Sequence, residues 1–213
     1  MPSYKAVIFD LDGTLIDSMN IWKQIDIEFL AKRNIKVPCD YMEAISHLCA
    51  YDTAIYTIER FNLSDTPPDL INEWIEMALC KYSEAKLKPG VQVYIDYLIK
   101  HNIQFSIATA TEPQILNAAL KGKSFEKDIH SIVTVSDVAR GKGFPDIYEK
   151  CAENMGVLPC ECIVFEDILT AVSAAKSAGF YTVAVYDECS KENAEKIKEI
   201  CDKYIFSFEE MLE

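Results

Sequence analysis

The chain has 213 residues, half of them apolar and a quarter charged, and its 34 acidic and 21 basic side chains give a formal net charge of −13. This length suits one large domain or a core domain with a smaller insertion, and the apolar fraction can fill a core without a metal or disulfide staple. The negative charge argues against nucleic acids and anionic membranes as partners, because both are bound through Lys/Arg clusters, and we find none.

No stretch approaches the roughly 18 consecutive apolar residues of a membrane span. The N-terminal Met-Pro-Ser-Tyr-Lys leads into a strand-like run, and not into an apolar signal segment. Of the eight cysteines, only Cys160 and Cys162 lie close together in the sequence, so reduced thiols are the expected state. We therefore expect a cytoplasmic protein that is a monomer or a weak dimer.

The first predicted strand, Ala6–Phe9, is followed by a helical insertion. Residues 17–87 show helical periodicity and no convincing strand. The apolar stripes of this segment comprise Ile21, Trp22, Ile25, Phe29 and Leu30, then Ile45, Leu48, Cys49, Ala54, Ile55, Ile58 and Phe61, then Leu70, Ile71, Trp74, Ala78, Leu79 and Tyr82. We predict a core domain of residues 1–16 and 88–213 and a helical cap domain of residues 17–87.

Beyond the insertion, short runs rich in Val and Ile alternate with amphipathic segments. The further predicted strands are Phe105–Ala108, Ile132–Val135, Ile163–Phe165 and Thr182–Val185. Thr111-Glu-Pro-Gln114 resembles a capping box that opens a helix, and Pro145 is placed to start another helix that Gly156 ends. The alternation predicts an α/β fold, a doubly wound (Rossmann-like) parallel sheet with the helical cap inserted.

Specific polar residues follow four of these predicted strands. They are Asp10 and Asp12 in Asp10-Leu-Asp12-Gly13-Thr14, then Thr109, then Lys142, then Glu166 and Asp167. In an open α/β sheet, ligands collect outside the carboxyl ends of the strands. The first motif alone could be a solvated loop, since Asp and Gly are common there, but four polar groups at one edge favour a functional site.

With these motifs the sequence resembles the haloacid dehalogenase superfamily, in its helical-cap branch that includes phosphoglycolate phosphatases and β-phosphoglucomutases. All four family motifs occur in order, and the match covers essentially the whole chain. Pro89-Gly90 is also similar to this branch. The resemblance implies a Mg²⁺-dependent phosphatase that hydrolyses a small phosphomonoester, of the sugar phosphate or phosphoglycolate type, through an aspartyl-phosphate.

The resemblance also implies which residues bind the metal and which residues take part in the reaction. Asp10 would be the nucleophile, and Asp12 would protonate the leaving oxygen and then activate water. The metal ligands would be Asp10, the backbone carbonyl of Asp12, Asp167 and, directly or through water, Glu166.

Four further residues would contact the substrate. Thr109 and the N–H of Ala110 would hold the transferring phosphoryl oxygens, and Lys142 would offset the repulsion between the nucleophile and the phosphate. Trp22 is expected either in the apolar core of the cap or at the border of the substrate cavity.

The sequence departs from the family pattern at three positions. Ile168 stands where a Ser is usual, Ala171 where a Gly is usual, and Gly143 where a Pro is usual. The charged groups are intact, so these departures concern loop geometry and metal affinity.

Several alternatives remain at this stage. A β-phosphoglucomutase-like phosphoryl transferase is disfavoured, because Trp22 replaces a cap histidine and Glu112 occupies a region where mutases carry a basic residue. A phospho-receiver domain would lack the helical insertion, and a haloacid dehalogenase would not need Asp12, Glu166 and Asp167 together. A non-catalytic family member is the last alternative.

Overall fold

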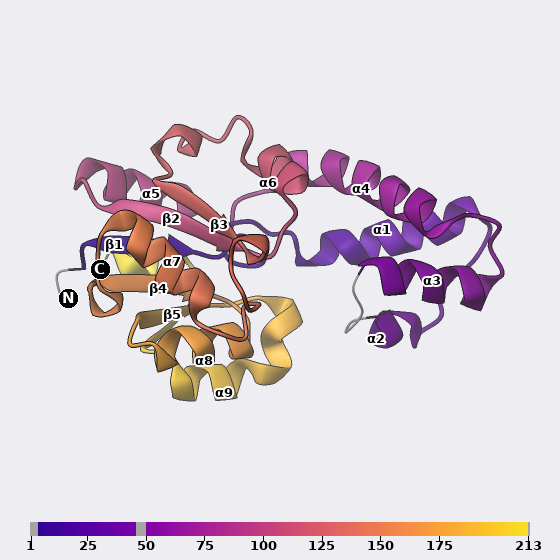
Figure 1. Ribbon diagram of the computed structural model, residues 1–213. Helices are drawn as coiled ribbons and strands as arrows, with labels where there is room; N and C mark the ends of the chain where they lie inside the picture. The colour runs from indigo at the N-terminus through magenta and orange to yellow at the C-terminus, as the bar shows by residue number, and fades with distance from the viewer. Residues whose placement is uncertain (1–3, 46–49, 213) are drawn as a thin grey trace. The chain divides into compact units, whose positions relative to one another are not determined.

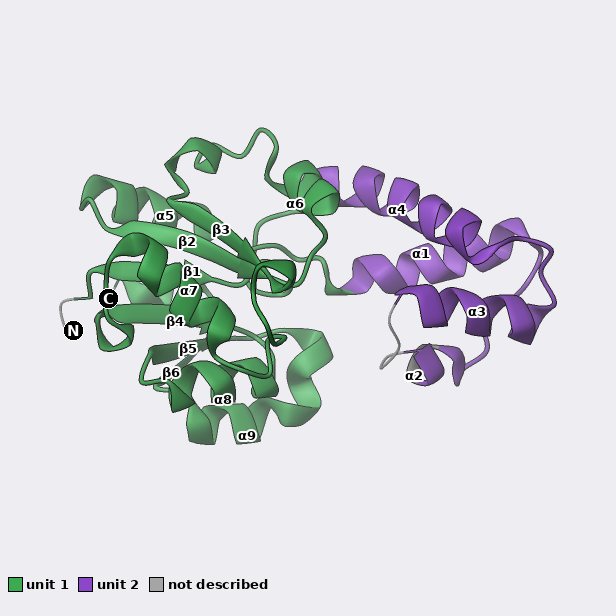
Figure 2. Ribbon diagram, in the orientation of Figure 1, with its two compact units in different colours: residues 1–19, 85–213 green, residues 20–84 purple. Residues whose placement is uncertain are grey.

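The computed structural model describes residues 4–45 and 50–212. The chain divides into two compact units (Figure 2): residues 1–19 and 85–213 form the first, and residues 20–84 form the second. The predicted insertion comprises residues 17–87.

The first unit is built on a six-stranded parallel sheet with the order β3-β2-β1-β4-β5-β6. Its strands are β1 (Ala6–Phe9), β2 (Gln104–Thr109), β3 (Ser131–Thr134), β4 (Cys162–Glu166), β5 (Tyr181–Val185) and β6 (Lys203–Ile205). The five predicted strands are confirmed, and each of their ends agrees to within one residue. The edge strand β6 was not predicted, because three residues are too few to show an alternating pattern.

Helices cover both faces of this sheet, as Figure 1 shows. They are α5 (Val91–Lys100), α6 (Pro113–Leu120), α7 (Asp146–Met155), α8 (Leu169–Ser177) and α9 (Ala194–Ile200). Single turns of 3₁₀ helix lie at Glu126–Asp128, Val135–Asp137 and Pro159–Glu161, and longer ones at Glu188–Asn193 and Phe208–Met211. The prediction of an α/β fold with a doubly wound parallel sheet is confirmed.

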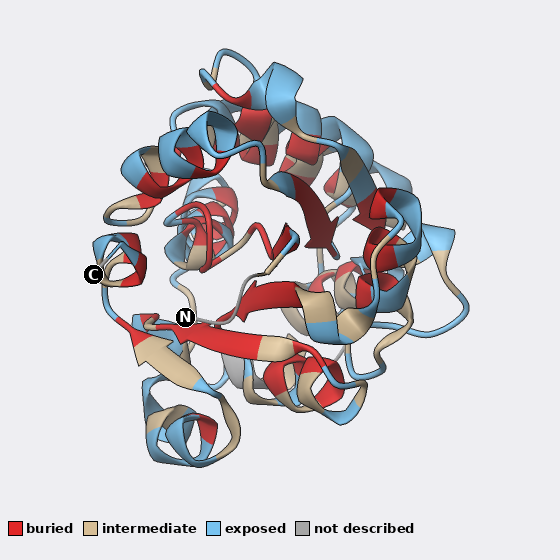
Figure 3. Ribbon diagram, turned by 90° about the vertical axis from the view of Figure 1, so that its left-hand side faces the viewer, coloured by how far each residue is buried: buried red, intermediate tan, exposed pale blue. Residues whose placement is uncertain are grey.

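Strand alternation sends successive side chains of β1 to opposite faces. Ile8 joins a core cluster with Tyr148 of α7 and Ala175 of α8. Phe9 points the other way, with its ring 6.2 Å from that of Tyr94 in α5 and 5.9 Å from that of Phe208. Strand β1 is therefore buried on both sides, and Figure 3 shows much of the sheet in red, the colour of buried residues.

The starts of two helices test the capping predictions. Pro145 is the N-cap of α7, and Gly156 ends that helix with φ +68°, both as expected. The capping box at Thr111 is wrong, because the N-cap of α6 is Glu112. The Thr111 side chain instead bonds to Thr109 and Asp12, as described below.

The second unit is helical, with α1 (Met19–Lys32, which begins in the first unit), α2 (Tyr41–Ile45), α3 (Ala50–Phe61) and α4 (Pro67–Ser83). The ring of Phe29 meets that of Trp74 at 5.4 Å in its core. Trp22 is 43% exposed, so the first of its two expected positions, in the apolar core of the cap, is wrong. Its position at the border of a substrate cavity stays a prediction. Two stripe residues, Leu48 and Cys49, lie outside the described residues.

No helix in the described ranges has both the length and the apolar character that crossing a bilayer requires.

Candidate active site

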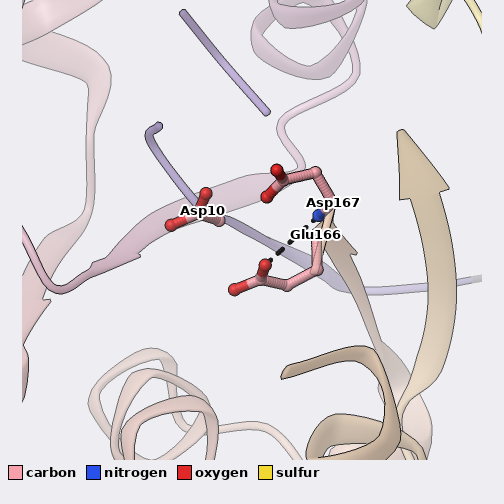
Figure 4. Close-up of side chains that lie close together, drawn as sticks. All are labelled: Asp10, Glu166 and Asp167. Atoms are coloured by element: carbon pink, nitrogen blue, oxygen red, sulfur yellow. Dashed lines mark hydrogen bonds between the residues drawn. The ribbon is translucent and has the colours of Figure 1, made fainter. Parts of the chain in front are cut away.

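Three carboxylates meet at the carboxyl edge of the sheet. Asp10 directly follows β1, and Glu166 is the last residue of the neighbouring strand β4. The backbone N–H of Asp10 donates to the carbonyl of Phe165 at 3.0 Å, which holds the two strand ends side by side. One oxygen from each of Asp10, Glu166 and Asp167 lies within 4.8 Å of the others (Figure 4). This spacing would let one cation contact all three.

The side chain of Asp167 carries the clearest evidence that a cation fits here. Its Oδ2 atom is buried and has no hydrogen-bond partner in the described structure, and such an orphaned oxygen costs free energy. Its Oδ1 atom accepts a long bond of 3.5 Å from the hydroxyl of Thr14. Gly13, at φ +80°, leaves the necessary room, because a Cβ there would lie 2.5 Å from Oδ2. Clustered carboxylate oxygens suit Mg²⁺.

Lys142 supplies the positive charge of the cluster. Its ammonium contacts the Asp10 carboxylate and lies 2.6 Å from Oε1 of Glu166, with only 15% of the side chain exposed. The Tyr148 hydroxyl donates to the same Glu166 oxygen at 2.7 Å. Lys142 lies in the segment between β3 and α7, Tyr148 in α7 and Glu166 in β4. Three separate parts of the chain therefore meet at this carboxylate.

The burial of these groups shifts their protonation equilibria. Burial raises the pKa of Asp10 well above its ordinary value, and Glu166 adds to this while Lys142 opposes it. Burial and then Glu166 raise the pKa of Asp167 to about 8. For Lys142, burial would lower the pKa, but the carboxylates of Asp10 and Glu166 outweigh it and raise the pKa instead. The cluster is therefore short of positive charge, which a divalent cation would supply.

Asp12 is held apart from this cluster by hydroxyl groups. Ser18 Oγ donates to its Oδ1 atom at 2.5 Å, and Thr111 Oγ1 donates to its Oδ2 atom. Thr111 is fixed in turn, because its backbone N–H donates to Thr109 Oγ1 at 3.0 Å. These contacts orient the Asp12 carboxylate beside the strand ends.

The structure brings some of the predicted site residues together and leaves others apart. The four that converge are Asp10, Glu166, Asp167 and Lys142. Thr109 is buried at the end of β2 and reaches Asp12 through Thr111. Ala110, the next residue, is exposed. Trp22 belongs to the second unit, where its ring lies 6.5 Å from that of Tyr82.

Four residues that support the site were not predicted as members of it. They are Thr14, Ser18, Thr111 and Tyr148. The sequence does not show whether a Ser, Thr or Tyr hydroxyl donates to a carboxylate or is solvated. Only the position of Thr111, two residues beyond Thr109, could have suggested its role.

The three departures from the family pattern leave the cluster in place. Ile168 is exposed as the N-cap of α8, and Ala171 is buried within that helix. Gly143 is exposed in the loop before α7. The hydrogen bonds and ion pairs described above for the carboxylates involve none of these three positions.

A parallel α/β sheet that gathers carboxylates, a buried lysine and hydroxyl groups at its carboxyl edge defines an enzyme with a cation-compatible acidic site.

Comparison with known proteins gives the family. The sequence profile of the haloacid dehalogenase-like hydrolase family matches residues 7–185, and the chain belongs to that family. It is 31% identical over 195 residues to a β-phosphoglucomutase of Bacillus subtilis, covering 85% of this chain and 83% of that one. It is 26% identical to the fructose-1-phosphate phosphatase YqaB of Escherichia coli, covering 85% and 96%.

A solved structure agrees on the fold. The crystal structure of a haloacid dehalogenase-type (HAD) hydrolase from Entamoeba histolytica superimposes with a TM-score of 0.78 at 24% identity, covering 97% of this chain and 94% of that one. Together with the phosphatase relatives, these findings confirm the predicted superfamily and the predicted class of enzyme, a phosphoric monoester hydrolase.

Proposed function

We propose that this protein is a Mg²⁺-dependent phosphatase that hydrolyses a small phosphomonoester through an aspartyl-phosphate on Asp10. The observation that carries the proposal is the convergence of Asp10, Glu166 and Asp167 within 4.8 Å, with the ammonium of Lys142 against two of them. Sugar phosphates or phosphoglycolate are the substrate types we expect. The carbohydrate phosphatases among the relatives support the first.

In the first half-reaction, an oxygen of the Asp10 carboxylate attacks phosphorus, and the bond from phosphorus to the leaving oxygen breaks. Asp12 gives its proton to that oxygen. Lys142 reduces the repulsion between the attacking carboxylate and the phosphate dianion. In the second half-reaction Asp12 takes a proton from water, the water oxygen bonds to phosphorus, and the bond from phosphorus to Asp10 breaks.

Asp10, Glu166, Asp167 and the backbone carbonyl of Asp12 would hold the Mg²⁺ ion. When bound, the ion neutralises charge on the carboxylates and on the transferring phosphoryl group. We propose that Thr109 and the N–H of Ala110 hold the phosphoryl oxygens and that Trp22 contacts the substrate. We also propose that residues 17–87 act as a cap that excludes water during transfer, in a cytoplasmic protein without nucleic acid or membrane partners.

Phosphoryl transfer between positions of one sugar is the second candidate, favoured by the 31% identity to a β-phosphoglucomutase. Hydrolysis remains our proposal because Trp22 and Glu112 stand where a histidine and a basic residue are usual in mutases. Glu112 is exposed at the start of α6, where its charge would repel a second phosphate group.

A panel of phosphorylated metabolites, followed by phosphorus NMR, tests the proposal. We expect inorganic phosphate to be released with Mg²⁺ and release to stop with EDTA. Conversion to an isomeric phosphate without release would establish the mutase. Phosphate release unaffected by EDTA would contradict the metal assignment. No turnover of any compound, with Mg²⁺ bound, would indicate a non-catalytic protein.

A further inference from the structure

A second buried ion pair lies at the carboxyl edge of the sheet, outside the proposed catalytic machinery. The Nζ atom of Lys88 is 2.9 Å from Oδ2 of Asp187, and the two side chains are 10% and 4% exposed. Within the described ranges, only the ion pairs of Lys142 are buried to a similar depth on both sides. Burying two charges costs desolvation free energy, which is offset only where the charges interact closely with each other or with a neighbouring charged group.

Lys88 stands where the chain re-enters the first unit. Its backbone N–H donates to the carbonyl of Leu15 at 2.9 Å, and the N–H of Asp17 donates to the carbonyl of Lys86 at 2.9 Å. The outgoing and returning segments are thus paired with each other. The backbone N–H of Leu15 also donates to the carbonyl of Leu11, the residue between Asp10 and Asp12. The Lys88 side chain therefore ties the loop that carries Asp10 to Asp187.

Asp187 lies at the same edge of the sheet as the carboxylate cluster. It comes two residues after β5, the strand that pairs with β4 and places Ala184 opposite Glu166. Its Oδ1 atom accepts a bond of 2.8 Å from the N–H of Cys189, so the carboxylate is fixed. Asp187 therefore follows the strand that pairs with β4, and β4 ends at Glu166, next to Asp167.

We propose that Lys88 and Asp187 form a positioning pair that sets the affinity of the carboxylate cluster for Mg²⁺. This inference rests on the metal site of the proposed function. Asp187 adds a negative charge that favours binding of the cation at Asp167. Lys88 partly neutralises that charge, and it also anchors the loop that carries Asp10. Neither residue is a metal ligand. The two therefore act in opposite directions on the same electrostatic potential.

The test is Mg²⁺ binding to the full chain, measured by calorimetry without substrate at pH 9, where protons compete least. Asp187→Asn keeps the shape and leaves the Lys88 charge uncompensated, so we expect affinity to fall about tenfold. Lys88→Met leaves Asp187 unneutralised, so affinity should rise about threefold or more. The double variant should bind at most about threefold more weakly than wild type, the product of the two single effects. Lys198→Met, which removes an exposed ammonium paired with Glu195, should change nothing.

Opposite signs for the two single variants are the required result, because a loss of folding would weaken both. The thermal midpoint of each variant without metal reports folding separately. If Lys88→Met does not fold, Lys88→Gln and Asp187→Asn give the same comparison. Weaker binding in both single variants, or unchanged binding in both, would overturn the inference alone. A wild-type chain that binds no Mg²⁺ would overturn the proposed function with it.

Discussion

The Nζ atom of Lys142 lies 2.6 Å from Oε1 of Glu166, an oxygen that also accepts from the Tyr148 hydroxyl at 2.7 Å. The other Glu166 oxygen, Oε2, accepts from the backbone N–H of Asp167 at 3.2 Å. Both oxygens of Glu166 are thus engaged, whereas Oδ2 of Asp167 has no partner in the described structure. Glu166 therefore fits an anchor for Lys142 with water-mediated contact to a metal, and Asp167 fits a direct ligand.

Replacing the nucleophile tests the central step. Asp10→Asn should reduce phosphate release to below about 0.1% of wild type, since an amide oxygen is a poor nucleophile toward phosphorus. The neutral side chain also relieves repulsion within a buried acidic cluster, so the metal-free protein should keep or raise its thermal midpoint. Steady-state kinetics and a melting curve check both outcomes. Retention of several per cent of activity would remove Asp10 from the nucleophile role.

Lys142 is expected to act on the transition state more than on folding. Lys142→Ala should cost about 2–4 kcal/mol of transition-state stabilisation, a loss of about 30- to 1,000-fold in kcat/KM. Lys121→Ala, at an exposed lysine at the end of α6, is the matched control and should retain full activity. The assignment fails if the two variants behave alike.

Metal affinity should rise with pH through the titration of Asp167. Burial, followed by Glu166, raises the pKa of this carboxyl to about 8 in the metal-free protein. Below pH 8 a proton occupies the group and competes with Mg²⁺; above it the competition ends. We expect Mg²⁺ binding at pH 7 to release protons, detected as a dependence of the calorimetric heat on the buffer's ionisation enthalpy. Asp167→Asn should reduce that proton release, and affinity that falls as pH rises would contradict the assignment.

The sequence predicted the sheet and the charged cluster because both have strong local signals. Buried parallel strands are apolar runs, and Asp10, Lys142 and Glu166 each follow such a run, so the carboxyl edge gathers them wherever the helices lie. The support from Ser18 and Tyr148 could not be predicted, because it depends on the rotamers of hydroxyl groups. Asp187 was missed for a similar reason: its partner Lys88 is 99 residues away.

Thr111 should control the orientation of Asp12. Thr111→Val keeps the shape of the side chain but removes the hydroxyl that donates to Asp12 Oδ2. Because proton transfer depends on the position of the acid–base group, we expect kcat to fall about 10- to 100-fold with little change in KM. Thr111→Ser should restore most of the activity. Equal losses in the two variants would mean that packing of the methyl group, and not the hydroxyl, is what matters.

The helical unit contains a titrating group of its own, Asp26 in α1. The side chain is 8% exposed, and burial raises its pKa to about 7. The folded state therefore binds this proton more tightly than the unfolded state does. Its contribution to stability is complete below about pH 4 and is lost as pH rises through 7. Asp26→Asn removes the ionisation and should stabilise the unit at pH 8 by up to about 3 kcal/mol, with little gain at pH 4.

Both tryptophans of the chain, Trp22 and Trp74, lie in this unit, so their fluorescence during urea unfolding follows it selectively. Glu76→Gln, at an exposed position of α4, removes one negative charge from the same unit and is the control. Its unfolding midpoint should move equally little at pH 4 and pH 8. A pH-independent effect of Asp26→Asn would show that the carboxyl does not titrate in the folded unit, because a difference in packing alone has no reason to vanish on acidification.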